Sequence, residues 1–264
     1  MSSTQPIGIF DSGVGGTSIW KEIHELLPFE KTIYLADSKN APYGKKPVRE
    51  IIELSIKNTE KLLEMGAKTI VVACNTATTN AIKVLRNTYN VPFIGIEPAI
   101  KPAALHSKTK AIGILATQGT LSSELFHQAS ELYSKDIHII EVEGHGLVEL
   151  IESGKKDSNQ TKNLLLKLLQ PMLLQSIDYL VLGCSHYPYL VPVLKQILPE
   201  EVQVIDSGEA VARQTKVVLT RNNLLAPEKG FKPIPEFFSN TNPEVLASLI
   251  NAKENNFQVS HLDF

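Results

Sequence analysis

The chain has 264 residues, of which 43% are hydrophobic and 20% are charged, and its formal net charge is −2. This is the composition of a globular protein with one large or two medium domains. The balanced charge excludes a broad basic surface for nucleic acid, and no apolar stretch approaches the roughly 20 residues of a membrane span. We therefore expect a small-molecule substrate, and neither nucleic acid nor a membrane as a partner.

Short apolar runs alternate with amphipathic stretches along most of the chain, which predicts βα units and parallel sheets. The expected strands are Ile7–Phe10, Thr32–Ala36, Thr69–Ala73, Phe93–Ile96, Ala111–Ala116, Ile137–Val142, Tyr179–Leu182 and Val202–Ile205. The expected helices are Thr17–Leu27, Val48–Glu64, Thr78–Arg86, Ser122–Tyr133, Leu147–Glu152, Thr161–Gln170, Leu190–Leu198 and Glu209–Leu219. Gly66 is expected to cap the second helix, and Pro171 to end or kink the helix that it interrupts.

An internal echo suggests two similar halves, because Ile9-Phe-Asp-Ser-Gly13 recurs as Val204-Ile-Asp-Ser-Gly208. We predict an α/β fold of two similar domains, each a mostly parallel sheet flanked by helices, with the active site in the cleft between them. The chain is expected to cross over at Glu97–Pro102 and to return near Asp206–Gly208. This gives a discontinuous first domain of residues 1–97 plus 209–264 and a second domain of residues 98–208.

The two cysteines, Cys74 and Cys184, stand in matching places, each after a short apolar run and directly before small polar residues. Ligands bind at the carboxyl ends of strands in open α/β sheets, so each half is expected to bring one thiol to a binding edge. Two opposed thiols suggest acid/base chemistry with a proton carrier on each side of a substrate. The alternative is that each cysteine is simply a small buried hydrophobic residue.

Other roles for the cysteines fit less well. The segment Met1–Pro6 lacks a basic region followed by an apolar core, so we expect no signal peptide. A cytoplasmic protein is expected, in which thiols stay reduced instead of forming a disulfide. The cysteines lie far apart in the chain and no residue cluster has the spacing of metal ligands, so no metal is expected.

Two loops after predicted strands carry further candidate residues. Asp11–Thr17 is rich in glycine, which allows a tight turn into a helix and exposes N–H groups to an anion; the alternative is only a tight turn. Its spacing matches neither a Walker A loop nor a dinucleotide motif, so no nucleotide cofactor is expected. Ser38–Pro47 is long for a βα connection and is either a solvated surface loop or a lid with Pro42, Tyr43 and Gly44 at its tip.

Polar groups beside the cysteines suit a zwitterionic amino acid, since they offer donors to carboxylates and acceptors to an ammonium group. A helix is expected to begin after each cysteine, which would lower the thiol pKa. The candidate substrate-binding residues are Asp11, Ser12, Pro42, Tyr43, Gly44, Asn75, Thr76, Thr117, Thr120, Ser185 and His186. For the two threonines at positions 117 and 120, helix N-capping is the alternative role.

Six motifs follow one another in the chain: Asp11-Ser-Gly-Val-Gly-Gly16, Ala41-Pro-Tyr-Gly44, Ala73-Cys-Asn-Thr-Ala77, Leu115-Ala-Thr-Gln-Gly-Thr120, Gly183-Cys-Ser-His-Tyr-Pro188 and Asp206-Ser-Gly208. In this order and spacing the chain resembles the glutamate racemases of the cofactor-independent Asp/Glu racemase superfamily. The resemblance runs from about Ile7 to Gly208.

The resemblance implies interconversion of L- and D-glutamate without pyridoxal phosphate or another cofactor, which supplies D-glutamate for peptidoglycan. It implies that Cys74 acts on D-glutamate and Cys184 on L-glutamate. Asp11 and His186 match the auxiliary acidic and imidazole groups of the family, and Glu152 matches the auxiliary Glu. A homodimer is common in this family.

The sequence departs from the family pattern in three places. Ser185 stands where the family usually has Thr, and the segment before Glu152 is Glu143-Gly-His-Gly146, where many members carry Cys-Pro. The short segment before the first strand predicts no activation by a peptidoglycan precursor.

Two other functions compete with racemisation. A Cys–His nucleophile that forms a thioester, as in amidases or acyl transferases, would use Cys184 and leave Cys74 idle. A two-lobed binding protein without chemistry would use both cysteines only in packing.

Overall fold

The computed structural model describes residues 2–264. The strands are β1 (Ile7–Asp11), β2 (Thr32–Ala36), β3 (Thr69–Val72), β4 (Phe93–Gly95), β5 (Ala111–Ala116), β6 (His138–Glu143), β7 (Tyr179–Gly183), β8 (Gln203–Ile205), β9 (Glu236–Ser239) and β10 (Gln258–His261). The α-helices are α1 (Thr17–Leu26), α2 (Val48–Glu64), α3 (Asn75–Thr88), α4 (Ile100–His106), α5 (Gln118–Leu121), α6 (Glu124–Glu131), α7 (Leu147–Glu152), α8 (Asn159–Leu173), α9 (Val191–Ile197), α10 (Gly208–Arg221), α11 (Glu244–Leu249) and α12 (Ala252–Asn255). Short 3-10 helices are η1 (Ser38–Asn40), η2 (Tyr43–Lys45) and η3 (Tyr187–Leu190).

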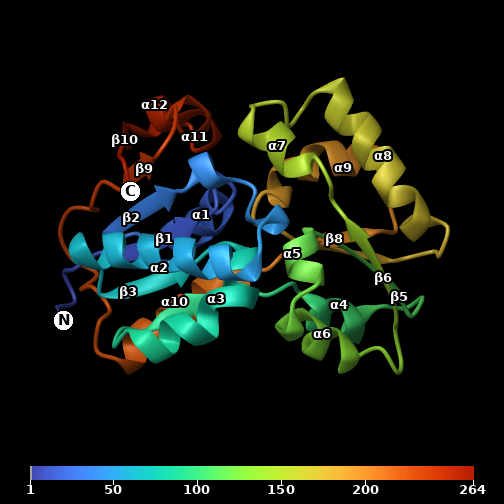
Figure 1. Cartoon of the computed structure of the whole chain (residues 1–264), viewed down its shortest axis with the longest axis horizontal. Coiled ribbons are helices and arrows are strands. Elements are labelled where there is room, and N and C mark those ends of the chain that lie inside the picture. Colours follow the sequence, from blue (N-terminus) through green and yellow to red (C-terminus); the bar gives the residue numbers. More distant parts are fainter. Residues whose placement is uncertain (1) are drawn as a thin grey trace.

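The strands form two separate sheets that lie side by side with helices around them (Figure 1). The first sheet has the order β10-β9-β2-β1-β3-β4 and the second the order β6-β5-β7-β8. The strand pairings in both sheets are parallel. The predicted α/β fold with two parallel sheets is therefore confirmed.

Helices cover both faces of the first sheet, because side chains along each strand point alternately to opposite faces. Ile7 and Ile9 of β1 join an apolar cluster with residues of α1 and α10, whereas Phe10 joins a cluster with residues of α2 and α3. A sheet that is buried on both faces needs strands that are apolar at every position. This requirement explains why the strands appear in the sequence as continuous apolar runs.

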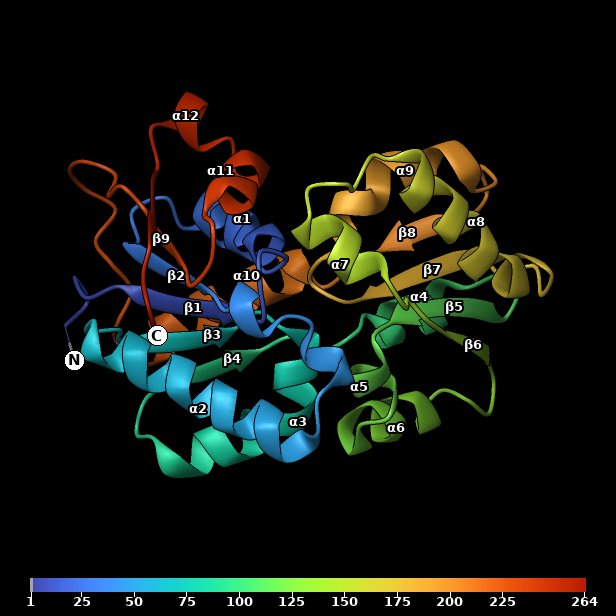
Figure 2. The ribbon, with the colours of Figure 1, turned by 45° about the horizontal axis from the view of Figure 1, so that its top comes forward.

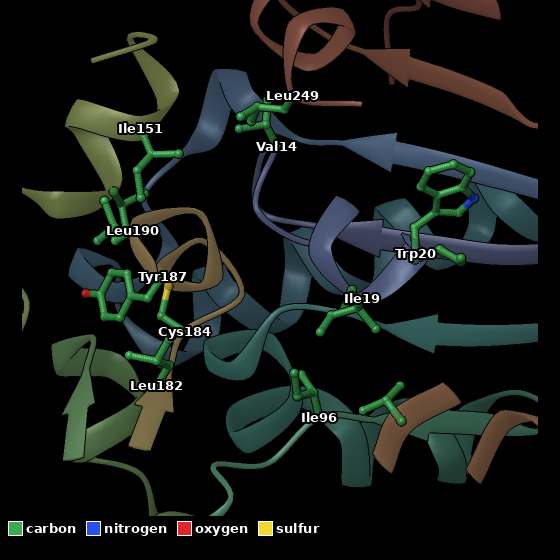
Figure 3. Close-up of a cluster of buried hydrophobic side chains, with 14 of the residues drawn as sticks. Val14, Ile19, Trp20, Ile96, Ile151, Leu182, Cys184, Tyr187, Leu190 and Leu249 are labelled. Atoms are coloured by element: carbon green, nitrogen blue, oxygen red, sulfur yellow. The ribbon is translucent and has the colours of Figure 1, made fainter. Parts of the chain in front are cut away.

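One apolar cluster continues from the first sheet into the second. It includes Ile9 of β1 and also Leu115 of β5 and Leu182 of β7. Figure 3 shows Cys184 in this cluster, near Leu182 and Tyr187, and on the side that faces Val14 and Ile19 of the first half. The two halves thus share a core around the second cysteine.

The predicted strands are confirmed to within one residue at their ends, but other elements differ from the prediction. The strands β9 and β10 were not expected, nor were α4, α11 and α12. The expected helix Ser122–Tyr133 is the shorter α6, which Ser123 caps by accepting from the Phe126 N–H, and the short α5 before it was not expected either. Pro171 does not end α8 at its own position, because α8 continues to Leu173. Pro171 lies in the last turn and is exposed. Proline has no N–H to donate to the main-chain carbonyl one turn earlier, but water can donate to that carbonyl instead.

The division of strands between the sheets supports the predicted domain boundaries. Strands β1–β4, β9 and β10 belong to the first sheet and β5–β8 to the second, and the two groups occupy separate halves of the molecule (Figure 2). Helix α10 packs on α1 of the first half. We propose the boundaries 97/98 and 208/209 on this basis. Within residues 2–264, no helix is both long and apolar enough to cross a membrane.

Candidate active site

Residues that follow strands of both sheets line one small cavity. They are Ser12, Pro42, Tyr43, Gly44, Cys74, Asn75, Thr76, Thr117, Val148, Cys184, Ser185 and His186. Parallel strands of a sheet end on the same edge, so residues far apart in the sequence meet there. The structure thus brings together the candidate residues of both halves, with Asp11, Glu152 and Thr120 directly behind the cavity wall.

The cavity is closed in this structure. The space open to the centre of a water molecule is about 10 Å³, which is room for about one water. The hydroxyls of Thr76 and Thr117 share a hydrogen bond of 2.8 Å across the cleft, and Ser18 donates to the Ser185 carbonyl at 2.8 Å. A ligand of amino-acid size therefore requires the two halves to part before it enters.

Cys74 caps the N-terminus of α3, where its Sγ accepts a hydrogen bond from the Ala77 N–H at 3.4 Å. Its thiol also lies 3.5 Å from the Ser12 Oγ. Burial raises the pKa of Cys74 well above its ordinary value, and the negative charge of Asp11 raises it further, against the lowering effect of the Ala77 N–H. The helix N-terminus thus lowers this thiol pKa as expected, but burial outweighs it, and the net shift in the closed structure favours the neutral thiol.

Cys184 follows β7 and lies beside an imidazole. Its Sγ is 3.8 Å from Nδ1 of His186, and Nε2 of the same ring is 2.6 Å from Oε1 of Glu152. Burial alone would lower the pKa of His186, but the hydrogen bonds with Cys184 and Glu152 and the charge of Asp11 hold it well above its ordinary value of 6.5. The raised pKa favours the protonated ring, in which Nε2–H faces Glu152 and Nδ1–H faces the thiol.

Asp11 ends β1 and is fully buried between the two halves. Its Oδ1 accepts from the Ser185 Oγ at 2.9 Å, its Oδ2 accepts from the Gly13 N–H at 3.1 Å, and Oδ2 lies 4.0 Å from Nδ1 of His186. Burial raises the pKa of Asp11 above its ordinary value, although the nearby His186 charge lowers it. Asp11 thus contacts residues on the Cys184 side while its charge also acts on Cys74.

Asn75 is the polar residue at the cavity whose side chain is left free. Both its Nδ2 and its Oδ1 are buried, and neither has a hydrogen-bond partner among residues 2–264. A buried amide without partners costs free energy unless a ligand or water completes its hydrogen bonds. Its place beside Cys74 makes it a ready donor and acceptor for a polar substrate. Thr76, Thr117 and Thr120 form a cluster of three hydroxyls next to it.

A buried carboxylate, that of Asp37, anchors the loop Ser38–Pro47. Asp37 accepts hydrogen bonds from the Tyr43 hydroxyl at 2.5 Å, from Asn40 Nδ2 at 2.8 Å and from Asn240 Nδ2 at 2.5 Å. Tyr43 is buried, so the loop forms a wall of the cavity, and its interpretation as a solvated surface loop is wrong. At Gly44 a Cβ would lie 2.7 Å from the Cβ of Thr117, so the close approach of the two halves requires a glycine here.

The glycines of the loop Asp11–Thr17 also allow the two halves to approach each other closely. A Cβ at Gly13 would overlap the carboxylate of Glu152, and a Cβ at Gly15 would overlap the ring of His186. The loop therefore packs its backbone directly against the side chains of the second half. Within residues 2–264, no group of three or more His, Cys, Asp or Glu side chains is arranged to hold a metal ion.

Three residues that contribute to the site were not expected from the sequence. The Val14 N–H donates to Oε1 of Glu152 at 2.6 Å, the Ser38 Oγ donates to Oε2 of the same carboxylate at 2.8 Å, and Val148 lines the cavity. A backbone N–H has no sequence signature, and a lone serine in a loop is common. Their roles depend on contacts across the cleft, which the chain order does not reveal.

Known proteins are similar to this chain over most of its length. The family model described as Asp/Glu/Hydantoin racemase matches residues 7–215. A glutamate racemase from Ectopseudomonas mendocina is 45% identical over 227 residues, which are 86% of this chain and 86% of that protein. A glutamate racemase from Pseudomonas aeruginosa strain PAO1 is 43% identical over 245 residues, or 92% of each chain.

Solved structures of glutamate racemases are similar to this chain over nearly its whole length. A glutamate racemase from Bacillus anthracis has a TM-score of 0.85 at 29% identity and covers 99% of this chain and 98% of its own. The Escherichia coli glutamate racemase, in complex with L-glutamate and the activator UDP-MurNAc-ala, has a TM-score of 0.85 at 32% identity, with 97% of both chains covered. The chain therefore belongs to the Asp/Glu/hydantoin racemase family.

Proposed function

We propose that this chain is a cofactor-independent isomerase that interconverts L- and D-glutamate and supplies D-glutamate for peptidoglycan synthesis in the cytoplasm. The observation that carries the proposal is the pair of buried thiols, one after a strand of each sheet, at one closed cavity. The relatives at 42–45% identity are glutamate racemases, which supports glutamate as the substrate. A homodimer belongs to the same proposal, and sedimentation of the purified protein tests it.

The reaction uses one thiol as the base and the other as the acid. Starting from L-glutamate, the Cys184 thiolate takes the α-proton, and the Cys74 thiol gives its own proton to the opposite face of the same carbon. The product is D-glutamate, and the enzyme is left with a thiol at Cys184 and a thiolate at Cys74. The reverse reaction exchanges the two roles. The raised pKa of Cys74 favours the neutral thiol, which is the protonation state that the L-to-D direction requires.

The other residues bind the substrate and hold its charges in a site without bulk water. Asn75 has an unused amide donor and acceptor at the cavity, and Ser12, Thr76 and Thr117 add hydroxyl groups. Fixed dipoles of this kind stabilise the negative charge that develops next to the α-carbon more strongly than water would. His186 pairs with the Cys184 side, where its charge compensates a thiolate.

Deuterium exchange distinguishes this proposal from its rivals. When the purified protein is incubated with L-glutamate in deuterated water, a racemase must place deuterium at the α-carbon and produce D-glutamate. An acyl-enzyme would instead release ammonia or transfer its acyl group to hydroxylamine, and a binding protein would do neither. If no deuterium enters the α-carbon when the enzyme is saturated with L-glutamate, the proposal is refuted.

Removal of metals is expected to leave activity unchanged. The acid and base groups of the proposed mechanism are all side chains of this protein, so dialysis against a chelator should change kcat by less than about twofold. The purified protein should also show no absorbance band of pyridoxal phosphate. Activity that disappears with the chelator and returns when one particular metal is added would contradict the cofactor-independent mechanism.

An ion pair at the cavity mouth is expected to contribute only weakly to closure. Lys45 Nζ of η2 lies 2.5 Å from Glu149 Oε1 of α7, and the two side chains are 46% and 40% exposed. Exposed pairs typically contribute about 0–1 kcal/mol. We expect Lys45→Met to change KM for either enantiomer by less than about fivefold and to leave kcat nearly unchanged.

The matched control for this pair is Lys46→Met, which removes the neighbouring lysine from an ion pair with Glu50 on the same side of the cleft. A double-mutant cycle of Lys45→Met and Glu149→Gln measures the coupling directly. Coupling above about 2 kcal/mol, well beyond an ordinary exposed pair, would show that this contact controls the opening of the cleft.

A further inference from the structure

The carboxylate of Glu152 is held by groups from both halves of the molecule. Glu152 ends α7, beside the second sheet, and its Oε1 accepts from Nε2 of His186 on the same side at 2.6 Å. The other two donors come from the first half: the Val14 N–H reaches Oε1 at 2.6 Å and the Ser38 Oγ reaches Oε2 at 2.8 Å. The orientation of the carboxylate therefore depends on the cleft being closed.

Ser38 is itself held in a fixed position on the first half. It directly follows Asp37, whose carboxylate is buried and accepts from Asn40 and Asn240. The next residue, Lys39, donates its N–H to Asn240 Oδ1 at 2.9 Å. The start of the loop is thus tied to the end of β9, and the Ser38 hydroxyl moves with the first sheet.

We propose that Ser38 is a positioning residue that couples closure of the cleft to the alignment of the His186–Glu152 pair. When the halves part to admit substrate, Ser38 and Val14 withdraw and Glu152 loses two of its three donors. When the halves close, these donors fix the carboxylate, which in turn orients the imidazole so that Nδ1 is directed at Cys184, 3.8 Å away. The proton relay on this side is therefore complete only around a closed site. This inference rests on the proposed racemase function.

The Ser38 hydroxyl can be tested without touching the substrate cavity, because it is not among the residues that line it. Ser38→Ala removes this donor to the charged carboxylate, and a hydrogen bond to a charged group contributes more than one between neutral groups. We expect kcat to fall on the order of tenfold and KM to stay within about twofold. The primary deuterium isotope effect on kcat with α-deuterated L-glutamate should rise, because proton transfer becomes slower relative to the other steps. Ser38→Thr keeps the hydroxyl and should restore kcat to within about threefold of the parent.

The matched control is Ser18→Ala, which removes another serine that donates across the cleft, to the Ser185 carbonyl at 2.8 Å, and that has no hydrogen bond to Glu152 or His186. It should keep both kcat and the isotope effect within about twofold of the parent. If Ser38→Ala does not fold, Ser38→Cys provides the test, since a thiol has a similar shape but is a weaker donor.

Two results would overturn the inference. One is a Ser38→Ala enzyme whose kcat and isotope effect equal those of the parent. The other is an equal loss in Ser38→Ala and Ser18→Ala, which would reduce Ser38 to a general contact between the halves. Failure of the proposed function gives a different result, because the parent protein itself would then show no α-deuteration of glutamate.

Discussion

Replacing either Cys74 or Cys184 by alanine is expected to lower kcat by at least about 10³-fold in both directions, within the range that general acid–base groups contribute. Both directions must suffer, because each turnover needs one thiolate to take the α-proton and one thiol to return a proton. Serine at either position should leave only traces of activity, since a hydroxyl is a far weaker acid at neutral pH. Circular dichroism of solutions of each pure enantiomer measures the rates.

The chain has only two cysteines, which provides a simple control for the alanine variants. Each variant should titrate one thiol after denaturation and should keep the far-ultraviolet spectrum of the parent. Both cysteines are buried, so alanine at either position leaves a small cavity. The loss of stability is smallest where the surrounding side chains can relax into that cavity. Racemisation by Cys74→Ala at a tenth of the parent rate or faster would refute the two-thiol mechanism.

The sequence predicts the sheets and the thiols for the same physical reason. A strand of a parallel sheet that is covered on both faces must be apolar throughout, so it stands out as a run such as Ala111–Ala116 and ends where polar residues begin. Those ends are also where ligands bind, and Cys74 and Cys184 follow two of them. The strands β9 and β10 are different. β10 is the edge strand of the first sheet and is mostly exposed, and its neighbour β9 is only half-buried at alternate residues, so neither forms a continuous apolar run in the sequence.

Contacts across the cleft could not be predicted from the sequence, because they depend on how two separately folded sheets meet. Ser38 and Val14 hold Glu152 from the opposite half, and no local pattern marks either of them. The same limit applies to electrostatics. A helix N-terminus suggests a lowered pKa for Cys74, but the closed cavity removes water from the thiol and burial raises the pKa instead.

His186→Asn is expected to slow proton transfer on one side of the substrate more than on the other. His186 contacts the Cys184 Sγ and pairs with Glu152, so its charge serves the thiol that removes the α-proton of L-glutamate. We expect kcat in the L-to-D direction to fall on the order of 100-fold, with a smaller loss in the D-to-L direction. Primary deuterium isotope effects measured from α-deuterated L- and D-glutamate should differ correspondingly, with the larger effect for L-glutamate.

Thermodynamics limits where this asymmetry can appear. Enantiomers have equal free energies, so the ratio of kcat/KM for the two directions must stay near one in every variant. A larger loss of kcat from L-glutamate must therefore be accompanied by an equal fall in the ratio of KM for L-glutamate to KM for D-glutamate. Asp11→Asn is the matched comparison: Asp11 accepts from Ser185 on one side, and its charge acts on Cys74 on the other, so both directions should slow alike. If His186→Asn also lowers kcat equally in both directions, with equal isotope effects, His186 acts on the whole pocket and not on Cys184 alone.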